Sequence, residues 1–264
     1  MRLRLLKPLV PPVLADLVSR SRSAVRFSGE FASWEDAAAR AEGYDAQEIT
    51  DRTVAATRRV VAGEAVYERD SVTFDHIEYS WPLLACLLQV GLERGSLRVA
   101  DFGGSLGSTW RQNSRYLQKL RIPLSWHVIE QEHLVTLGNE EFSDGVLRFY
   151  NSIPEAVQDG VDVVLFSSSL CYVRDPEQYL REAAAASAQF MIVDRLPTIS
   201  GAHDRITVQH VYEPIYRASY PIRFFAEETL QAGLLAGWRI RETWDCDLQP
   251  DRKSRCQGYF LEKR

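Results

Sequence analysis

Short apolar runs alternate with amphipathic segments through the second half of the chain. The runs have the length of single strands and the segments between them have helical periodicity, an alternation typical of a parallel sheet with crossover helices. Residues 161–167 are almost unbroken in their apolar character, which predicts a strand covered on both faces. The predicted strands are 97–101, Leu124–Ile129, Leu147–Tyr150, 161–167, 190–193, 238–244 and 258–261.

Helix signals lie between these strands and before them. Asp175 can cap a helix over residues 176–188, because Pro176 suits a first turn, and a helix over residues 227–236 stops at Gly237. Residues 34–62 are alanine-rich and helical in pattern, with Ser33 as the cap. We therefore expect a basic arm (1–26), a helical cap (27–90) and a Rossmann-like α/β domain (91–264).

The stretch 97–110, LRVADFGGSLGSTW, is the most informative part of the chain. Its apolar run ends in Asp101 and passes directly into glycines, and the next predicted strand ends in Glu130. An acid and clustered glycines at a strand-to-helix junction are how a parallel sheet accommodates a nucleoside-bearing cofactor. The G-x-G-x-x-G spacing of dinucleotide sites does not fit here, and an ordinary strand-to-helix turn is the alternative interpretation.

The loop resembles the D/E-x-G-x-G-x-G motif of class I S-adenosylmethionine-dependent methyltransferases. Asp101, Gly103 and Gly107 are in register with that motif, and Ser105 replaces the middle glycine. The resemblance implies S-adenosylmethionine as the cofactor and an α/β fold with a seven-stranded, Rossmann-like sheet. The two last strands, separated by PDRKSR, resemble the antiparallel hairpin that completes such a sheet.

A second resemblance extends from about residue 27 to the end of the chain. It rests on the segments GEFASWEDA, GYD, YERD, YSWPLLA, DFGGSLG, SSSLCYV, DRLP and TVQHVYEPIYRASYP. Together they are similar to a family of methyltransferases encoded in bacterial polysaccharide and O-antigen gene clusters. This resemblance implies methylation of a small or glycan-linked acceptor, most simply at a sugar hydroxyl during surface-polysaccharide formation.

The resemblance to class I methyltransferases also implies roles for individual residues. Glu130 would accept hydrogen bonds from the ribose hydroxyls, whereas Tyr150 and Asn151 stand where many relatives have an acid for the adenine amine. The full set of expected cofactor residues is Asp101, Gly103, Gly104, Ser105, Gly107, Glu130, Ser168, Ser169 and Tyr172.

Acceptor residues and a base are expected on the opposite side of the same edge. Removal of a hydroxyl proton needs a base, for which His210, His203 and Asp194 are the candidates. Arg195 can hold an acidic sugar or a phosphate. Tyr67, Glu68, Arg69 and Asp70 are expected to form an acceptor-side wall, for which a solvated turn is the alternative.

Net charge and cysteine content exclude some of the remaining classes of function and kinds of site. A formal net charge of −5 disfavours a nucleic-acid binder, which would carry a basic footprint. The four cysteines have no metal-ligand spacing, so we expect no metal site and no disulfide, as in a cytoplasmic protein.

The first 26 residues carry six basic side chains and a single acid, and prolines interrupt their apolar residues. Such an arm either packs on its own domain or rests peripherally on an anionic membrane. Two other functions stay open for the whole chain, a NAD-dependent sugar oxidoreductase or epimerase and a non-catalytic partner with a methyltransferase fold. The first of these lacks its expected G-x-G-x-x-G and Tyr-x-x-x-Lys motifs.

Overall fold

The computed structural model describes residues 25–44, 46–213, 215–235, 237–246 and 250–264. Nearly all of the basic arm predicted over residues 1–26 lies outside these ranges, and its contact with a membrane stays a prediction. None of the helices in the described ranges is both long enough and apolar enough to cross a membrane.

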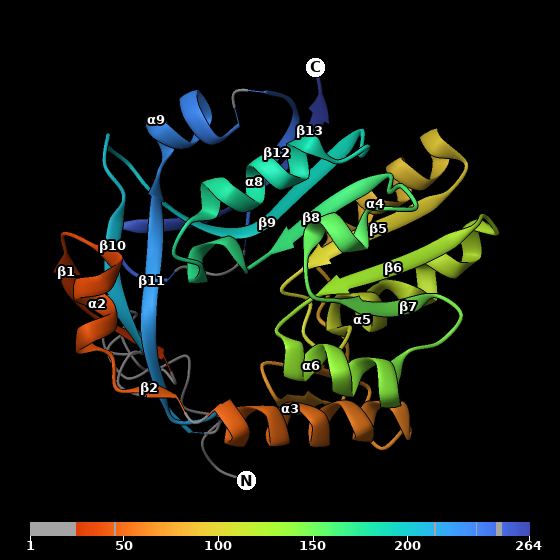
Figure 1. Cartoon of the computed structure of the whole chain (residues 1–264), viewed down its shortest axis with the longest axis horizontal. Coiled ribbons are helices and arrows are strands. Elements are labelled where there is room, and N and C mark those ends of the chain that lie inside the picture. Colours follow the sequence, from red (N-terminus) through yellow and green to blue (C-terminus); the bar gives the residue numbers. More distant parts are fainter. Residues whose placement is uncertain (1–24, 45, 214, 236, 247–249) are drawn as a thin grey trace, which may run out of the picture.

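A mostly parallel sheet forms the centre of the molecule (Figure 1). Five parallel strands lie in the order β7, β6, β5, β8, β9, then β13 pairs antiparallel with β9, and β12 pairs antiparallel with β13. Their bounds are β5 Leu97–Phe102, β6 Leu124–Ile129, β7 Leu147–Tyr150, β8 Val163–Ser167, β9 Phe190–Ile199, β12 Trp238–Asp245 and β13 Ser254–Lys263. This is the seven-stranded arrangement of class I methyltransferases, so the fold class and the closing hairpin predicted from the sequence are confirmed.

The chain runs outward from β5 through β6 to β7, then crosses to β8 on the other side of β5. The carboxyl ends of β5 and β8 therefore flank a topological switch point, the place where open α/β sheets bind ligands. All five side chains of β8 are buried, as expected for a strand covered on both faces.

Helices cover both faces of this sheet. One apolar cluster joins the sheet to α4, α5 and α6, and a second joins it to α7, α8 and the turn after α9. The bounds of these elements are α4 Trp81–Arg94, α5 Ser108–Leu117, α6 Glu132–Leu137, α7 Ile153–Ala156, α8 Pro176–Ala185 and α9 Glu227–Thr229. Short turns of other helix types lie at η2 Gln118–Leu120, η3 Gly138–Phe142, η4 Leu170–Tyr172 and η5 Leu230–Leu234.

Local capping explains where several helices begin. Ser33 Oγ accepts from the Asp36 amide at 3.1 Å, and Asp175 Oδ1 accepts from the Gln178 amide at 3.1 Å. Both predicted caps are confirmed. The helix predicted over 227–236 is confirmed over residues 227–234, although only the three residues of α9 are α-helical and the rest form a π-helix.

A second set of strands continues the sheet beyond β8. Ser167 and Asp194 are the last paired residues of β8 and β9, and further along β9 the neighbour on this side is β11, paired at Thr198 and Phe225. Strand β10 follows β11, β1 lies on the outer edge of β10, and β2 pairs with β11 (Figure 1). The bounds are β1 Val25–Phe31, β2 Gly43–Tyr44, β10 Arg205–Val211 and β11 Ala218–Ala226.

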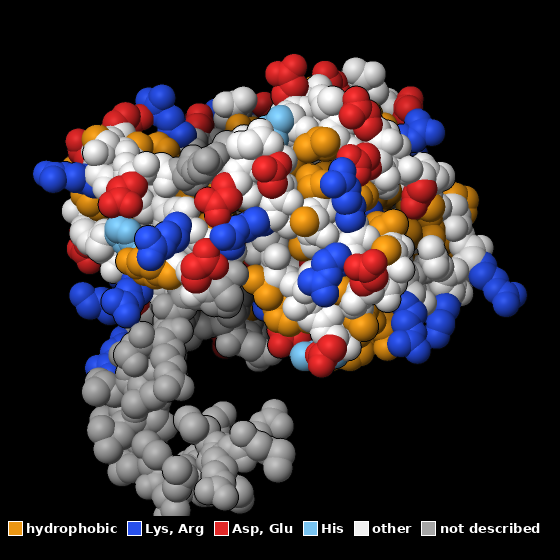
Figure 2. Space-filling view, turned by 90° about the horizontal axis from the view of Figure 1, so that it is seen from below, with side chains coloured by type: hydrophobic (Ala, Val, Ile, Leu, Met, Phe, Trp, Pro, Cys, Tyr) orange, Lys and Arg blue, Asp and Glu red, His pale blue; other side chains and the backbone are white. Residues whose placement is uncertain are grey.

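The segment 27–90, expected to be a helical cap, is therefore only partly helical. Besides β1 and β2 it contains α2 (Trp34–Arg40), α3 (Ala46–Val61) and a hairpin of β3 (Tyr67–Arg69) and β4 (Val72–Phe74). Helix α3 runs below α5 and α6 in Figure 1, and the Arg58 guanidinium on α3 makes two hydrogen bonds to the Glu141 carboxylate of η3. Over the face seen in Figure 2, basic and acidic side chains are interspersed.

Candidate active site at the carboxyl edge of the sheet

The glycine loop between β5 and α5 has a backbone that ordinary side chains tolerate poorly. Gly103 and Gly107 have φ values of +73° and +90°, and Ser105 between them is also left-handed at +53°. A Cβ at Gly103 would lie 2.6 Å from the Cβ of Ser169, so the loop passes directly against the end of β8. The left-handed backbone at Gly103 and Gly107 thus favours glycine at both positions. At Gly103 the close approach of the loop to the end of β8 also leaves no room for a side chain.

Asp101 lies beneath this loop. Its side chain is 1% exposed, and Oδ2 accepts a hydrogen bond from Trp126 Nε1 at 2.9 Å. A Cβ at Gly104 would lie 2.6 Å from the same oxygen. Burial raises the pKa of Asp101 to about 7, although the bond from Trp126 opposes the shift. Asp101 therefore supports the loop from below, and we correct the expectation that it faces a ligand.

Glu130 follows β6 and reaches the glycine loop from the neighbouring strand. Its Oε1 accepts from the Ser105 amide at 3.1 Å, and its Oε2 accepts from the Gln131 amide at 3.0 Å. Burial raises its pKa, and these two backbone hydrogen bonds oppose that shift. A carboxylate has about four lone-pair positions, so two remain for a ligand.

The end of β8 continues the edge next to the loop. Ser168 is left-handed at φ +58°, and Ser169 Oγ is buried without a hydrogen-bond partner among the described residues. Arg195 lies midway along β9, directly after the last residue that pairs with β8, and is left-handed at φ +54°. Ser105, Ser168 and Arg195 are thus three strained non-glycine residues in this region, the first two after β5 and β8 and the third within β9, and such a concentration of backbone strain is typical of binding sites.

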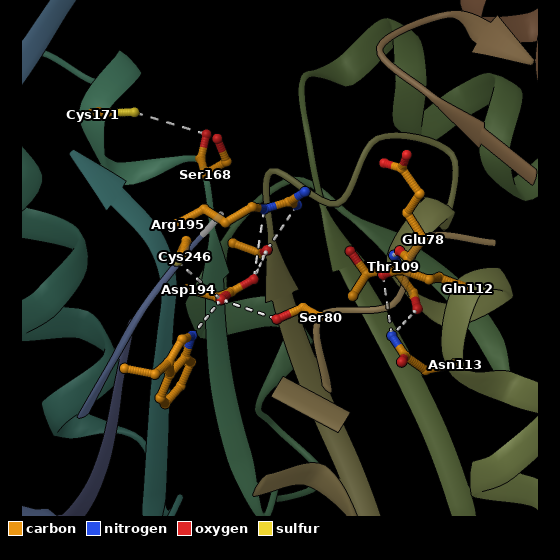
Figure 3. A network of polar contacts seen from close by, with 12 residues as sticks. Glu78, Ser80, Thr109, Gln112, Asn113, Ser168, Cys171, Asp194, Arg195 and Cys246 are labelled. Atoms are coloured by element: carbon orange, nitrogen blue, oxygen red, sulfur yellow. Dashed lines mark hydrogen bonds and ion pairs between the residues drawn. The ribbon is translucent and has the colours of Figure 1, made fainter. Parts of the chain in front are cut away.

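Asp194, the residue before Arg195, is completely buried and held by donors from four parts of the chain (Figure 3). Oδ1 accepts from Trp244 Nε1 at 3.1 Å and from Ser80 Oγ at 3.4 Å. Oδ2 accepts from Ser167 Oγ at 3.2 Å and lies 3.5 Å from Arg195 Nε. A carboxylate so enclosed organises the edge but cannot reach an acceptor, so the structure corrects its assignment as a base.

A row of phenols and one amide faces the edge from the second set of strands. Tyr172 Oη, on η4, donates to Gln209 Oε1 at 3.1 Å, and Gln209 Nε2 donates to Tyr220 Oη at 3.2 Å. The hydroxyls of Tyr220 and Tyr216 lie 3.4 Å apart, and the rings of Tyr172 and Tyr220 meet edge to face at 5.5 Å. We call Tyr172, Gln209, Tyr216 and Tyr220 the phenol wall. Tyr172 was expected among the cofactor residues, and the structure instead groups its hydroxyl and its ring with Gln209 and Tyr220.

The β3–β4 hairpin joins the phenol wall to the glycine loop. Glu68 is 2% exposed, its carboxylate accepts a hydrogen bond from Ser108 Oγ at the start of α5, and burial raises its pKa to about 7. Asp70, in the two-residue turn, is exposed and interacts electrostatically with Tyr172 and Tyr220. Tyr67 is buried, and burial raises its pKa to about 12.

Three of the four residues of the predicted acceptor-side wall thus lie at this edge. The exception is Arg69, whose guanidinium pairs with Glu78 at 3.2 Å.

Neither candidate histidine lies in this region. His210 and Gln209 are consecutive on β10, so their side chains leave opposite faces of the strand. Gln209 belongs to the phenol wall, whereas His210 Nε2 lies 2.7 Å from Ser28 Oγ of β1. His203 lies beyond Ile199, and five residues of extended strand, about 16 Å, separate Ile199 from Asp194. The expectation that His203 or His210 is the base is therefore corrected.

Sequence reasoning missed Gln209, Tyr216 and Tyr220. All three lie in the segment TVQHVYEPIYRASYP, in which only His210 was predicted to be a functional residue. The alternating residues of β10 are a signal for Gln209 alone, because that period separates the face of Gln209 from the face of His210. Within the described residues, no group of three or more His, Cys, Asp or Glu side chains could hold a metal ion.

No family model matches the chain, and no curated protein matches its sequence. Among solved structures, the N-terminal domain of EvdMO1 with SAH and D-fucose has a TM-score of 0.49 at 14% identity, covering 84% of this chain and 98% of its own. Magnesium protoporphyrin IX methyltransferase (ChlM) from Synechocystis PCC 6803 with bound SAM has a TM-score of 0.45 at 13% identity, covering 84% and 99%. The [4+2]-cyclase SpnF has a TM-score of 0.49 at 12% identity, covering 82% and 94%.

Proposed function

We propose that the protein is an S-adenosylmethionine-dependent methyltransferase that acts on a hydroxyl of a small or glycan-linked acceptor, most simply a sugar used in surface-polysaccharide formation. The observation that carries the cofactor part is the meeting of Glu130 with the strained glycine loop at the switch point of the sheet. A carboxylate at the end of the second strand, beside a loop that excludes side chains, suits a nucleoside's ribose.

The residues at the edge fit this cofactor in polarity as well as in position. Glu130 keeps acceptor capacity for two hydroxyls, and Ser169 offers a buried hydroxyl that lacks a partner in the described chain. When bound, the cofactor supplies an electrophilic methyl group on a sulfonium centre. The carboxylates of Asp194 and Glu130 at this edge favour a ligand that carries positive charge.

The phenol wall supports an acceptor with several hydroxyl groups. Each tyrosine offers an apolar ring face together with a hydroxyl that donates and accepts, and Gln209 adds an amide between two of them. Such a surface can stack on the face of a sugar ring while it exchanges hydrogen bonds with the ring's edge. The choice of a sugar also rests on the sequence resemblance described above.

Asp70 is the carboxylate we assign as the base for the acceptor hydroxyl. It is exposed at the turn of the β3–β4 hairpin, it interacts with Tyr172 and Tyr220, and Asp194 and Glu68 are both enclosed. Asp70→Asn should lower turnover by about 10²- to 10⁴-fold, the usual contribution of a general base, without weakening cofactor binding. His210→Ala serves as the matched control and should leave turnover unchanged. Equal turnover in the Asp70 variant and the wild type would remove Asp70 from the reaction.

The first experiment is titration calorimetry of the full chain with S-adenosylmethionine and S-adenosylhomocysteine, with NAD and NADP as comparisons. Binding of the two sulfur compounds alone, at micromolar concentration, supports the proposal and justifies a screen of activated sugars and lipid-linked glycans. Binding of NAD or NADP alone would favour an oxidoreductase. Binding of none of the four would contradict a cofactor-dependent activity of either kind.

A further inference from the structure

Arg195 has a position that its expected role as an acceptor residue does not explain. The residue lies midway along β9, just beyond the last residue that pairs with β8, in a left-handed conformation with φ +54°, and its side chain is 20% exposed. Figure 3 shows it extending from β9, past Ser168, toward the side on which Thr109 of α5 lies. The guanidinium thus leaves its own strand and reaches across the end of β8 toward the glycine loop.

The contacts of the guanidinium leave part of it available for a ligand. Nη2 donates to Ser167 Oγ at 3.0 Å, and Nε lies 3.5 Å from Asp194 Oδ2 without forming a hydrogen bond. Among the described residues, Nη1 makes no hydrogen bond. Because Asp194 also receives donors from Ser80, Ser167 and Trp244, its carboxylate is fully engaged, and it holds the guanidinium in place.

The electrostatic surroundings place this charge between the glycine loop and the β3–β4 hairpin. The guanidinium interacts with Asp101 under the loop, and with Tyr67 and Asp70 of the hairpin. Glu68 on β3 and Glu130 at the end of β6 belong to the same edge of the sheet, where they bond to Ser108 of α5 and to the Ser105 amide of the loop. An edge so rich in carboxylates would repel an anionic group unless a cation met it.

We infer that Arg195 binds the methionyl carboxylate of S-adenosylmethionine, which makes it a cofactor residue rather than an acceptor residue. This inference rests on the proposed function. The sulfonium and ammonium groups of the cofactor suit the acids of the edge, whereas its carboxylate requires a donor of opposite charge, and the planar guanidinium supplies paired N–H groups for it. An acidic group of the acceptor is the competing occupant, and the experiment below separates the two.

The test compares two ligands that differ only in that carboxylate, S-adenosylmethionine and decarboxylated S-adenosylmethionine, by calorimetry. The wild type should bind the carboxylate-bearing ligand about 10- to 100-fold more tightly, the usual range for a charged hydrogen bond. Arg195→Gln should abolish that preference by weakening S-adenosylmethionine while leaving the affinity for the decarboxylated ligand unchanged. Arg174→Gln, at an exposed arginine that pairs with Glu35, is the matched control and should keep the preference.

Arg195→Lys covers the case in which the glutamine variant does not fold, because it keeps a charge beside Asp194. A lysine offers a point charge without the paired donors, so the preference should fall severalfold but persist. An undiminished preference in both Arg195 variants would overturn the inference and leave the guanidinium to the acceptor. Failure of the wild type to bind either ligand would instead refute the proposed function, and the inference with it.

Discussion

The buried carboxyl of Asp101 should make stability depend on pH in a way that one substitution can isolate. Its pKa rises from 3.8 to about 7 because folding removes it from water. The folded protein therefore retains this proton between pH 4 and pH 7, while the unfolded chain releases it. A group of this kind contributes stability that is present at low pH and is lost as the pH rises through the folded pKa.

The magnitude follows from the difference between the two pKa values. About 3 pH units correspond to about 4 kcal/mol of unfolding free energy, lost between pH 4 and pH 8. Asp101→Asn cannot ionise and keeps an oxygen that can accept from Trp126 Nε1. Relative to the wild type, the variant should therefore gain as much as about 4 kcal/mol over this interval, with the gain levelling off above pH 7.

Urea denaturation of both proteins at intervals from pH 4 to pH 8 measures this difference. Other titrating groups, including Glu68 with its similarly raised pKa, are present in both proteins and cancel in the comparison. A constant offset between the two proteins at all pH values would reflect only altered packing. That result would refute the argument that a protonated Asp101 lies beneath the loop.

Three further substitutions address the site directly. Glu130→Ala should weaken the binding of S-adenosylmethionine by about 1.5 to 3 kcal/mol in calorimetry, the usual range for a charged hydrogen bond. Glu132→Ala, at an exposed acid two residues away, is the control and should leave the affinity unchanged. Gly103→Ala should abolish cofactor binding and lower the unfolding free energy by about 1 to 3 kcal/mol, because the backbone at Gly103 is left-handed and a Cβ there would meet Ser169. Gly145→Ala is the control: a Cβ at Gly145 would meet no atom within 4 Å, so neither quantity should change. Tyr172→Phe removes a hydroxyl of the phenol wall and should raise KM for the acceptor with cofactor affinity unaltered; an unchanged KM would place the acceptor elsewhere.

The parallel core could be predicted because strands that are buried on both faces have continuous apolar sequences. The run at 161–167 is the clearest case, and β8 occupies most of it. The accessory strands were harder to predict because one face of each is polar. In β10, Thr207 and Gln209 alternate with Ile206 and Val208, so the strand has no continuous apolar run.

The same contrast holds for the site. Asp101 and Glu130 were found because each ends an apolar run, and parallel strands bring their ends to one edge. Gln209 and Tyr220 come together with Tyr172 only through the pairing of β10 with β11, which no local pattern reveals. His210 was a candidate because of its chemistry and because it follows the fifth predicted strand, but the register of β10 turns it toward Ser28.

The pairing of β1 with β10 has a consequence for how the protein is made. Val25 pairs with Val211, so the partner of β1 is synthesised 186 residues later. At ribosomal rates of about 5–20 residues per second, the nascent β1 strand waits roughly 10 to 40 s for its neighbour. During that time Phe27 and Phe31 belong to an unpaired strand, the kind of segment that chaperones shield from self-association. Among the strands that the structure describes, an edge strand of the finished sheet is thus the first to emerge and among the last to pair.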